Sequence, residues 1–123
     1  MERNHSRVKS FHFAFSGLNH ALYTQKNFQI QVLIAFLVLA LAWVLDFSRW
    51  EWIILVILIG LVLTAELLNT VIEVVVDLAV KEQMLPDAKV AKDVAAASVL
   101  LMSFVSVFGG ILLFWPHLSF LFE

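Results

Sequence analysis

Three carboxylates and an amide share one side of a strongly apolar stretch, and they are the residues best placed to do chemistry. They are Glu66, Asn69, Glu73 and Asp77. At about 100° per residue of an α-helix, these four positions fall within a sector of roughly 80°. Leucine, isoleucine and valine cover most of the remaining surface of residues 66–77. We call these four residues the acidic wall, because the other sides of this helix are predicted to be apolar.

The acidic wall continues an apolar run, residues 53–65, without a turn signal. This pattern predicts that the wall forms the end of a membrane-spanning helix. An ionisable side chain inside a bilayer costs at least about 2.5 kcal/mol, so it usually faces a bundle interior and marks a functional site. The wall is therefore a candidate functional site.

The spacing of the carboxylates indicates a division of roles. Glu66 and Glu73 are separated by about 10 Å along a helix axis, which is too far for a carboxylate dyad. Glu73 and Asp77 lie nearer to water and are suited to binding a hard cation through oxygen. Glu66 lies deeper, about 20 Å along the helix from residue 53, and is a candidate general base for a hydroxyl at membrane depth. Asn69 belongs to this candidate site or, alternatively, is an interhelical hydrogen-bonding group.

Lys92 and Asp93 open the last apolar segment. Lys92 can neutralise phosphate oxygens near a helix N-terminus, and Asp93 can bind a metal or accept a hydrogen bond. The alternative is an interfacial charge pair or a cap. The glycines stand at positions 17, 60, 109 and 110 and form neither a Walker loop nor a kinase glycine-rich loop. These residues alone predict a cation-dependent membrane site and leave transport and catalysis open.

The composition predicts the architecture that positions this site. Of the 123 residues, 62% are hydrophobic, which is more apolar surface than a soluble domain of this size can bury. We therefore predict one all-α integral membrane domain over residues 1–123. There is no cysteine, and the formal charge of −2 gives no indication of nucleic-acid binding.

Three transmembrane helices are predicted, over residues 28–45, 52–80 and 91–115. Residues 5–24 are predicted to form an amphipathic helix on the membrane surface, and a helix packed on the bundle is the alternative. Ser6 or Asn4 is expected to cap this first helix, and Asp87 to cap the last one.

Basic residues predict the orientation of the chain. With three spans, only Arg49 falls on one side of the membrane. The other side carries Arg3, Arg7, Lys9, Lys26, Lys81, Lys89 and Lys92. The positive-inside rule places these seven, the N-terminus and the acidic wall at the cytoplasmic face of the plasma membrane, where ATP and Mg²⁺ are found.

Two segments together resemble the signature of the small prokaryotic diacylglycerol kinase/undecaprenol kinase family. They are Glu66-Leu-Leu-Asn69-Thr70-Val-Ile-Glu73-Val-Val-Val-Asp77 and Ala88-Lys-Val-Ala-Lys92-Asp93. The resemblance covers nearly the whole chain, including residues 13–18 and 26–28. It implies a lipid kinase that transfers the ATP γ-phosphate to the hydroxyl of diacylglycerol or undecaprenol. It also implies a homotrimer with sites shared between protomers.

The resemblance also implies roles for individual residues. Glu66 would be the catalytic base, and Glu73 would bind Mg²⁺ and the nucleotide. Asn69 would support the site. The other implied nucleotide-binding residues are Phe13, Gln25, Asp77, Lys92 and Asp93.

This chain departs from the family pattern at two positions. Gln25 stands where many members carry a glutamate as a second metal ligand, and Phe13 stands where a tyrosine is common. An ion-coupled transporter and a catalytically impaired homologue are the alternative functions.

Overall fold

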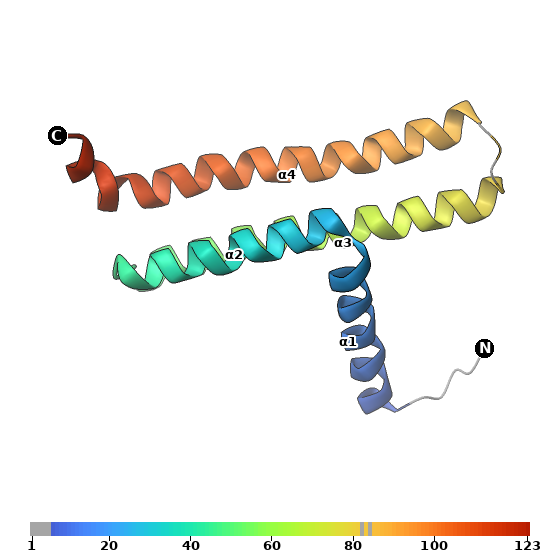
Figure 1. Ribbon diagram of the computed structural model, residues 1–123, viewed down its shortest axis with the longest axis horizontal. Coiled ribbons are helices and arrows are strands. Elements are labelled where there is room, and N and C mark those ends of the chain that lie inside the picture. Colours follow the sequence, from blue (N-terminus) through green and yellow to red (C-terminus); the bar gives the residue numbers. More distant parts are fainter. Residues whose placement is uncertain (1–5, 82, 84) are drawn as a thin grey trace.

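The computed structural model describes residues 6–81, 83 and 85–123. These residues form four α-helices and a short 3-10 helix (Figure 1). The helices are α1 (Arg7–Thr24), α2 (Lys26–Val44), α3 (Arg49–Val80) and α4 (Pro86–Leu118), and the 3-10 helix is η1 (Ser119–Phe122). No strand occurs among the described residues, so the predicted all-α class is confirmed.

Helices α2, α3 and α4 are long and apolar enough to cross a membrane, which confirms the three predicted spans. Each begins a few residues earlier than expected from the sequence. Helix α3 has 32 residues. It is therefore about 48 Å long at 1.5 Å per residue, whereas the hydrocarbon core of a bilayer is about 30 Å thick. One end of α3 must consequently project beyond the apolar layer.

The ends of α3 are defined by local hydrogen bonds and backbone geometry. Ser48 Oγ accepts from the Glu51 N–H at 3.3 Å, and Glu51 Oε1 accepts from the Ser48 N–H at 3.0 Å. This reciprocal pair is a capping box, which satisfies N–H groups that the helix itself leaves unpaired. At the other end, Lys81 adopts a left-handed conformation with φ 49° and stops the helix.

Helix α1 begins as predicted with Ser6, whose Oγ accepts from the Lys9 N–H at 3.3 Å. The alternative cap Asn4, the basic residue Arg3 and the predicted helix start at residue 5 lie outside the described residues. Among the residues of α1, only Ala21 is buried. Most side chains of α1 are exposed, and its amphipathic character and its place on the membrane surface remain predictions.

The prediction that Asp87 caps the last helix is wrong. The N-cap lies two residues earlier, at Leu85, and Pro86 is the first residue of α4. Proline suits this position because its fixed φ is already helical and its missing N–H would be unpaired there anyway. Asp87 instead lies in the first turn, where its charge is favourable to the helix dipole.

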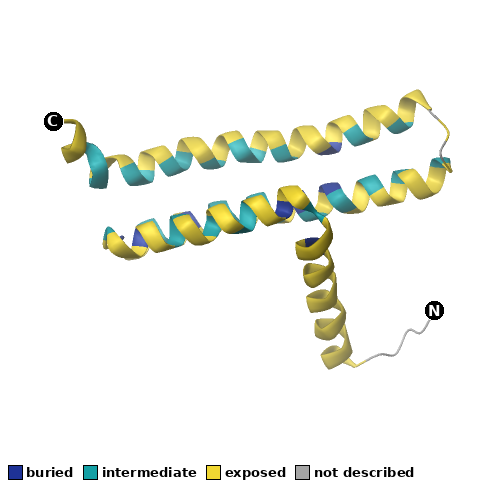
Figure 2. Ribbon diagram, in the orientation of Figure 1, coloured by how far each residue is buried: buried dark blue, intermediate teal, exposed yellow. Residues whose placement is uncertain are grey.

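The other two spans, α2 and α4, both pack against α3 (Figure 1). Helix α4 runs antiparallel along most of α3, α2 packs antiparallel against its first part, and α1 turns sharply away from the start of α2. The small core consists of Ala42, Phe47 and Leu55, and most other side chains are exposed (Figure 2). This pattern is typical of a chain whose outer surface is covered by lipid.

Candidate functional site

The acidic wall lies where the start of α2 and the first half of α4 approach α3. Among the described residues, the buried polar side chains are Glu66, which is 3% exposed, and Asn69, which is 8% exposed. Glu73 is half-buried and Asp77 is exposed. The wall therefore runs from an enclosed carboxylate, Glu66, to an accessible one, Asp77.

Glu66 is held by a contact that the sequence analysis did not find. Gln31 of α2 donates from Nε2 to Glu66 Oε2 at 3.4 Å. Thr70 Oγ1 donates to the Glu66 backbone carbonyl at 3.1 Å. The available signal for Gln31 was its amide within residues 28–45, where Gln29 is the other polar side chain and the rest are apolar. A polar group inside a spanning helix needs a partner, and here that partner is the buried carboxylate.

Asn69 connects the two levels of the acidic wall. Its Nδ2 donates to Glu73 Oε1 at 3.3 Å, one turn further along α3. Its Oδ1 is buried without a hydrogen-bond partner in the described structure. Because a buried carbonyl oxygen normally has a partner, this unpaired atom is available to a donor or a cation.

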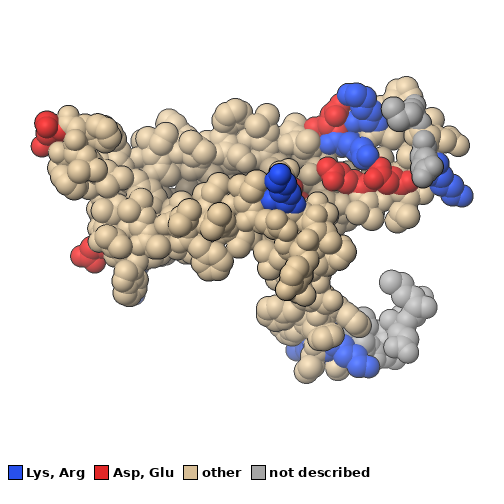
Figure 3. Space-filling view, in the orientation of Figure 1, with Lys and Arg blue, Asp and Glu red and all other residues tan. Residues whose placement is uncertain are grey.

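The charged residues near the α3–α4 connection form ion pairs both between helices and within one helix. Lys92 Nζ lies 2.6 Å from Asp77 Oδ1 and joins α4 to the end of α3. Lys89 Nζ lies 2.6 Å from Asp93 Oδ2, one turn apart on α4. Lys92 and Asp93 are therefore each paired with a different residue. Acidic and basic side chains gather at this end of the molecule, whereas the opposite end carries few of them (Figure 3).

Two further candidate residues, Gln25 and Phe13, lie next to α1 and on it. Gln25 is the residue between α1 and α2, is half-buried, and donates its backbone N–H to the Ala21 carbonyl at 2.9 Å. Phe13 is exposed on α1, with its ring centroid 6.2 Å from that of His12. No hydrogen bond among the described residues connects the Gln25 side chain to Glu66 or Glu73.

The oxygen atoms of the wall fit a hard cation that is shared with a ligand. The described residues contain no group of three histidine, cysteine or carboxylate side chains that could hold a metal alone. Mg²⁺ commonly uses only one or two carboxylates and completes its octahedron with phosphate oxygens and water. Glu73, beside the unpaired Asn69 Oδ1, matches that requirement.

Two hollows lie near the wall. A hollow of about 1030 Å³ between the end of α3 and the start of α4 is lined mainly by apolar residues, with Asp77, Lys89 and Lys92 among the charged ones. An apolar cavity of about 470 Å³ lies between α2, α3 and α4 and has Gln31 among its lining residues. The first hollow therefore carries charged groups beside Asp77, and the second reaches Gln31, the partner of Glu66.

The fold and the site define a helical membrane protein in which carboxylate and ammonium side chains gather near the connection between α3 and α4. A family model described as prokaryotic diacylglycerol kinase matches residues 12–114. The chain therefore belongs to the prokaryotic diacylglycerol kinase family, and the predicted enzyme class, a lipid kinase, is confirmed at the level of the family.

Individual relatives agree with this assignment. The chain is 40% identical over 110 residues to the undecaprenol kinase of Bacillus subtilis, covering 89% of each chain. It is 40% identical over 111 residues to a diacylglycerol kinase of Synechocystis, covering 89% of this chain and 63% of the relative. It is 29% identical over 110 residues to the diacylglycerol kinase of Escherichia coli K12, covering 89% of each chain.

Proposed function

We propose that this protein is an ATP- and Mg²⁺-dependent kinase that phosphorylates the hydroxyl of diacylglycerol or undecaprenol at the cytoplasmic membrane face. The observation that carries the proposal is the placement of Glu66, which is 3% exposed and lies on the same helix face as Glu73 and Asp77. A membrane kinase needs a base at the depth of the lipid hydroxyl and charged groups nearer to water. The names of the relatives include both lipids and favour neither.

In this mechanism, Glu66 accepts the proton of the lipid hydroxyl as the hydroxyl oxygen bonds to the γ-phosphorus of ATP. The bond from that phosphorus to the bridging oxygen breaks, and ADP leaves with the electron pair. Glu66 then returns its proton to water. Gln31 orients the carboxylate through its 3.4 Å hydrogen bond. Phosphoryl transfer requires mainly positioning and charge stabilisation, so a sparse site is sufficient.

Glu73 and Gln25 are proposed to hold Mg²⁺, with Asn69 supporting Glu73 through their hydrogen bond. When bound, the ion neutralises phosphate charge that develops during transfer. Lys92 and Asp93 are proposed to contact the nucleotide, with Asp77 keeping Lys92 in place through their ion pair. Phe13 is proposed to pack against the nucleotide.

We propose a homotrimer in which α1 of one protomer contributes to the site of a neighbour. This proposal is supported by the direction of α1, which turns away from α3 and α4 (Figure 1), and by the Gln25 side chain, which makes no hydrogen bond to Glu66 or Glu73 within the described part of the chain. The cytoplasmic orientation of the N-terminus is supported by the basic residues at the same end as the acidic wall.

The direct test is transfer of radiolabelled γ-phosphate by purified protein in mixed micelles. Diacylglycerol and undecaprenol are each offered with ATP and Mg²⁺. We expect labelled lipid phosphate with at least one acceptor and none without Mg²⁺. No lipid phosphate above the heat-inactivated control, together with ATP-independent ion flux in liposomes, would instead support the transporter alternative.

Replacing Lys92 with alanine is expected to raise the KM for ATP about 10- to 100-fold, because a hydrogen bond to a charged group contributes about 1.5–3 kcal/mol. The stability of the fold should change little, because the side chains of Lys92 and Asp77 are 39% and 63% exposed. Exposed ion pairs contribute only about 0–1 kcal/mol. Steady-state kinetics with varied ATP measures the effect.

Lys89→Ala is the matched control, because Lys89 lies one turn earlier on α4 and pairs with Asp93 within that helix. We expect a much smaller rise in the KM for ATP in this variant. Equal effects of the two substitutions would assign Lys92 a general electrostatic role instead of a phosphate contact.

A further inference from the structure

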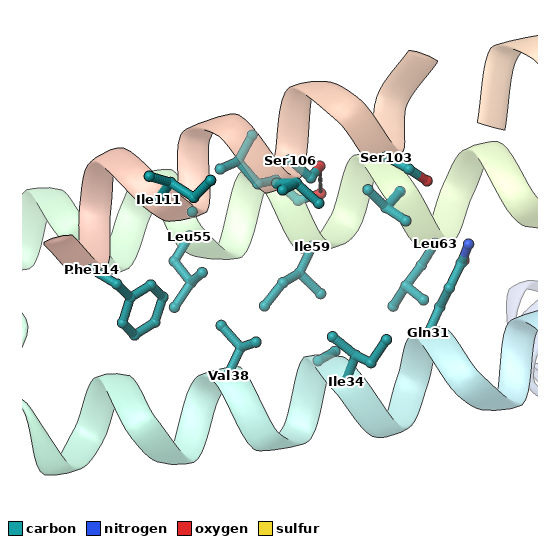
Figure 4. A pocket seen from close by; sticks show the side chains of 15 residues that line it. Gln31, Ile34, Val38, Leu55, Ile59, Leu63, Ser103, Ser106, Ile111 and Phe114 are labelled. Carbon is teal, nitrogen blue, oxygen red and sulfur yellow. Dashed lines mark hydrogen bonds between the residues drawn. The ribbon is translucent and has the colours of Figure 1, made fainter. Parts of the chain in front are cut away.

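The apolar cavity between the three spans has one polar end. Aliphatic side chains of α2, α3 and α4 face this space, with Gln31 at one end and Phe114 at the other (Figure 4). Val62 and Leu63 line it one turn before Glu66 on α3. The cavity therefore approaches the acidic wall from the membrane side.

Gln31 presents an unused acceptor at this polar end. Its Nε2 is occupied by Glu66, whereas its Oε1 is buried and has no hydrogen-bond partner in the described structure. A buried carbonyl oxygen without a donor is uncommon and indicates that a ligand or water supplies one. A hydroxyl at the head of a hydrocarbon chain supplies this donor next to Glu66.

We propose that the cavity holds the hydroxyl end of the single hydrocarbon chain of a prenyl alcohol, with the hydroxyl bound between Gln31 Oε1 and Glu66 and the rest of the chain extending into the bilayer. This proposal rests on the proposed kinase function and names the acceptor class. The hydroxyl first donates to Gln31 Oε1. Rotation of its O–H onto the neighbouring Glu66 carboxylate then places the proton on the base and frees the oxygen to attack the γ-phosphorus.

The cavity is better matched to a prenyl alcohol than to a diacylglycerol. A diacylglycerol carries two ester carbonyls close to its hydroxyl and two hydrocarbon chains. Of the two hydroxyl side chains in the described lining, Ser106 already donates to the Leu58 carbonyl at 3.5 Å, which leaves Ser103. The cavity therefore offers one free hydroxyl donor and one apolar channel, which do not match the two ester carbonyls and two hydrocarbon chains of a diacylglycerol. A prenyl alcohol has one chain and no polar group besides its hydroxyl.

Gly110 provides a way to block the cavity. It lines the cavity on α4, and a Cβ added there meets nothing within 4 Å. It lies seven residues beyond Ser103, or about 10 Å further from the Gln31 end. A leucine at this position would fill the path of a long chain and leave room for a short one.

Gly60 on α3 is the matched control. A Cβ at Gly60 also meets nothing within 4 Å, and Gly60 is exposed and absent from the cavity lining. Gly109 is unsuitable, because its Cβ would lie 2.8 Å from Leu58 Cδ1.

The experiment measures kcat/KM for undecaprenol, geraniol and dioleoylglycerol in wild type, Gly110→Ala, Gly110→Leu and Gly60→Leu. Wild type should prefer undecaprenol over dioleoylglycerol by about tenfold or more, and Gly110→Leu should lower kcat/KM for undecaprenol by a similar factor. Gly110→Ala should fall between wild type and Gly110→Leu. Retained phosphorylation of geraniol by Gly110→Leu shows that this variant is folded, and Gly60→Leu should resemble wild type with all acceptors.

Three results would overturn the assignment of a prenyl alcohol and leave the proposed kinase function intact. The first is an equal or higher kcat/KM for dioleoylglycerol, and the second is equal behaviour of Gly110→Leu and Gly60→Leu. The third is a changed oligomeric state of Gly110→Leu together with an equal loss of kcat/KM for both prenyl alcohols. That result would show that Gly110 lies at an interface between protomers and not in the path of the lipid. Absence of phosphate on every acceptor in wild type would overturn the proposed function itself, and this assignment with it.

Discussion

Glu66→Gln is expected to lower kcat by about 10²- to 10⁴-fold and to leave the KM for ATP nearly unchanged. Glutamine has almost the same shape and keeps a hydrogen-bonding group beside Gln31, but it cannot accept the hydroxyl proton. Glu66 is 3% exposed and lies about 10 Å along the axis from Glu73, so the substitution does not reach the proposed nucleotide region. Steady-state kinetics with lipid and ATP varied separately measures both parameters.

Glu51→Gln is the matched control for this prediction. Glu51 lies at the opposite end of α3, where its Oε2 is 2.7 Å from His117 Nε2. This change should alter thermal stability in detergent more than kcat. Comparable losses of kcat in the two variants would contradict a specific role for Glu66.

Glu73→Gln is expected to raise the Mg²⁺ concentration for half-maximal activity by about 10- to 100-fold, with kcat largely restored at high Mg²⁺. The amide can still present an oxygen to the ion but removes a negative charge. The substitution should also weaken the hydrogen bond that Asn69 Nδ2 donates to Glu73 Oε1 at 3.3 Å in the wild-type protein. Activity measured over a series of free Mg²⁺ concentrations at saturating ATP tests this expectation.

Gln25→Glu provides the opposite change at the other proposed ligand. An added carboxylate there should lower the Mg²⁺ requirement. Asp87→Asn removes a charge from the exposed first turn of α4 and should leave the requirement unchanged. An unaltered Mg²⁺ dependence in Glu73→Gln would exclude Glu73 as a ligand.

The features that follow from local sequence were predictable. The three spans, the Ser6 cap and the shared face of Glu66, Asn69, Glu73 and Asp77 depend on hydrophobic runs, short-range hydrogen bonds and helix periodicity. Each of these is determined by residues within a few turns of one another. Asp87 was misplaced because aspartate and proline both favour the first positions of a helix, and here proline occupies the first position.

The contacts between helices were not predictable in the same way. Gln31 and Glu66 are 35 residues apart, and their hydrogen bond depends on how α2 is rotated against α3. The pairing of Lys92 with Asp77, and not with its neighbour Asp93, depends similarly on the approach of α4 to α3. Hydrophobic periodicity gives the side of a helix that is buried, but it does not give the partner residue. The apolar cavity is a product of the same packing.

The division of roles along α3 can be tested by one measurement: calorimetric binding of a non-hydrolysable ATP analogue to wild type, Glu66→Gln and Glu73→Gln over a range of Mg²⁺ concentrations. We expect Glu66→Gln to bind the analogue like wild type at every Mg²⁺ concentration, and Glu73→Gln to bind weakly until Mg²⁺ is raised. Equal losses of nucleotide affinity in both variants would show that the two carboxylates do not act at separate levels, and would contradict Glu66 as a base for the lipid.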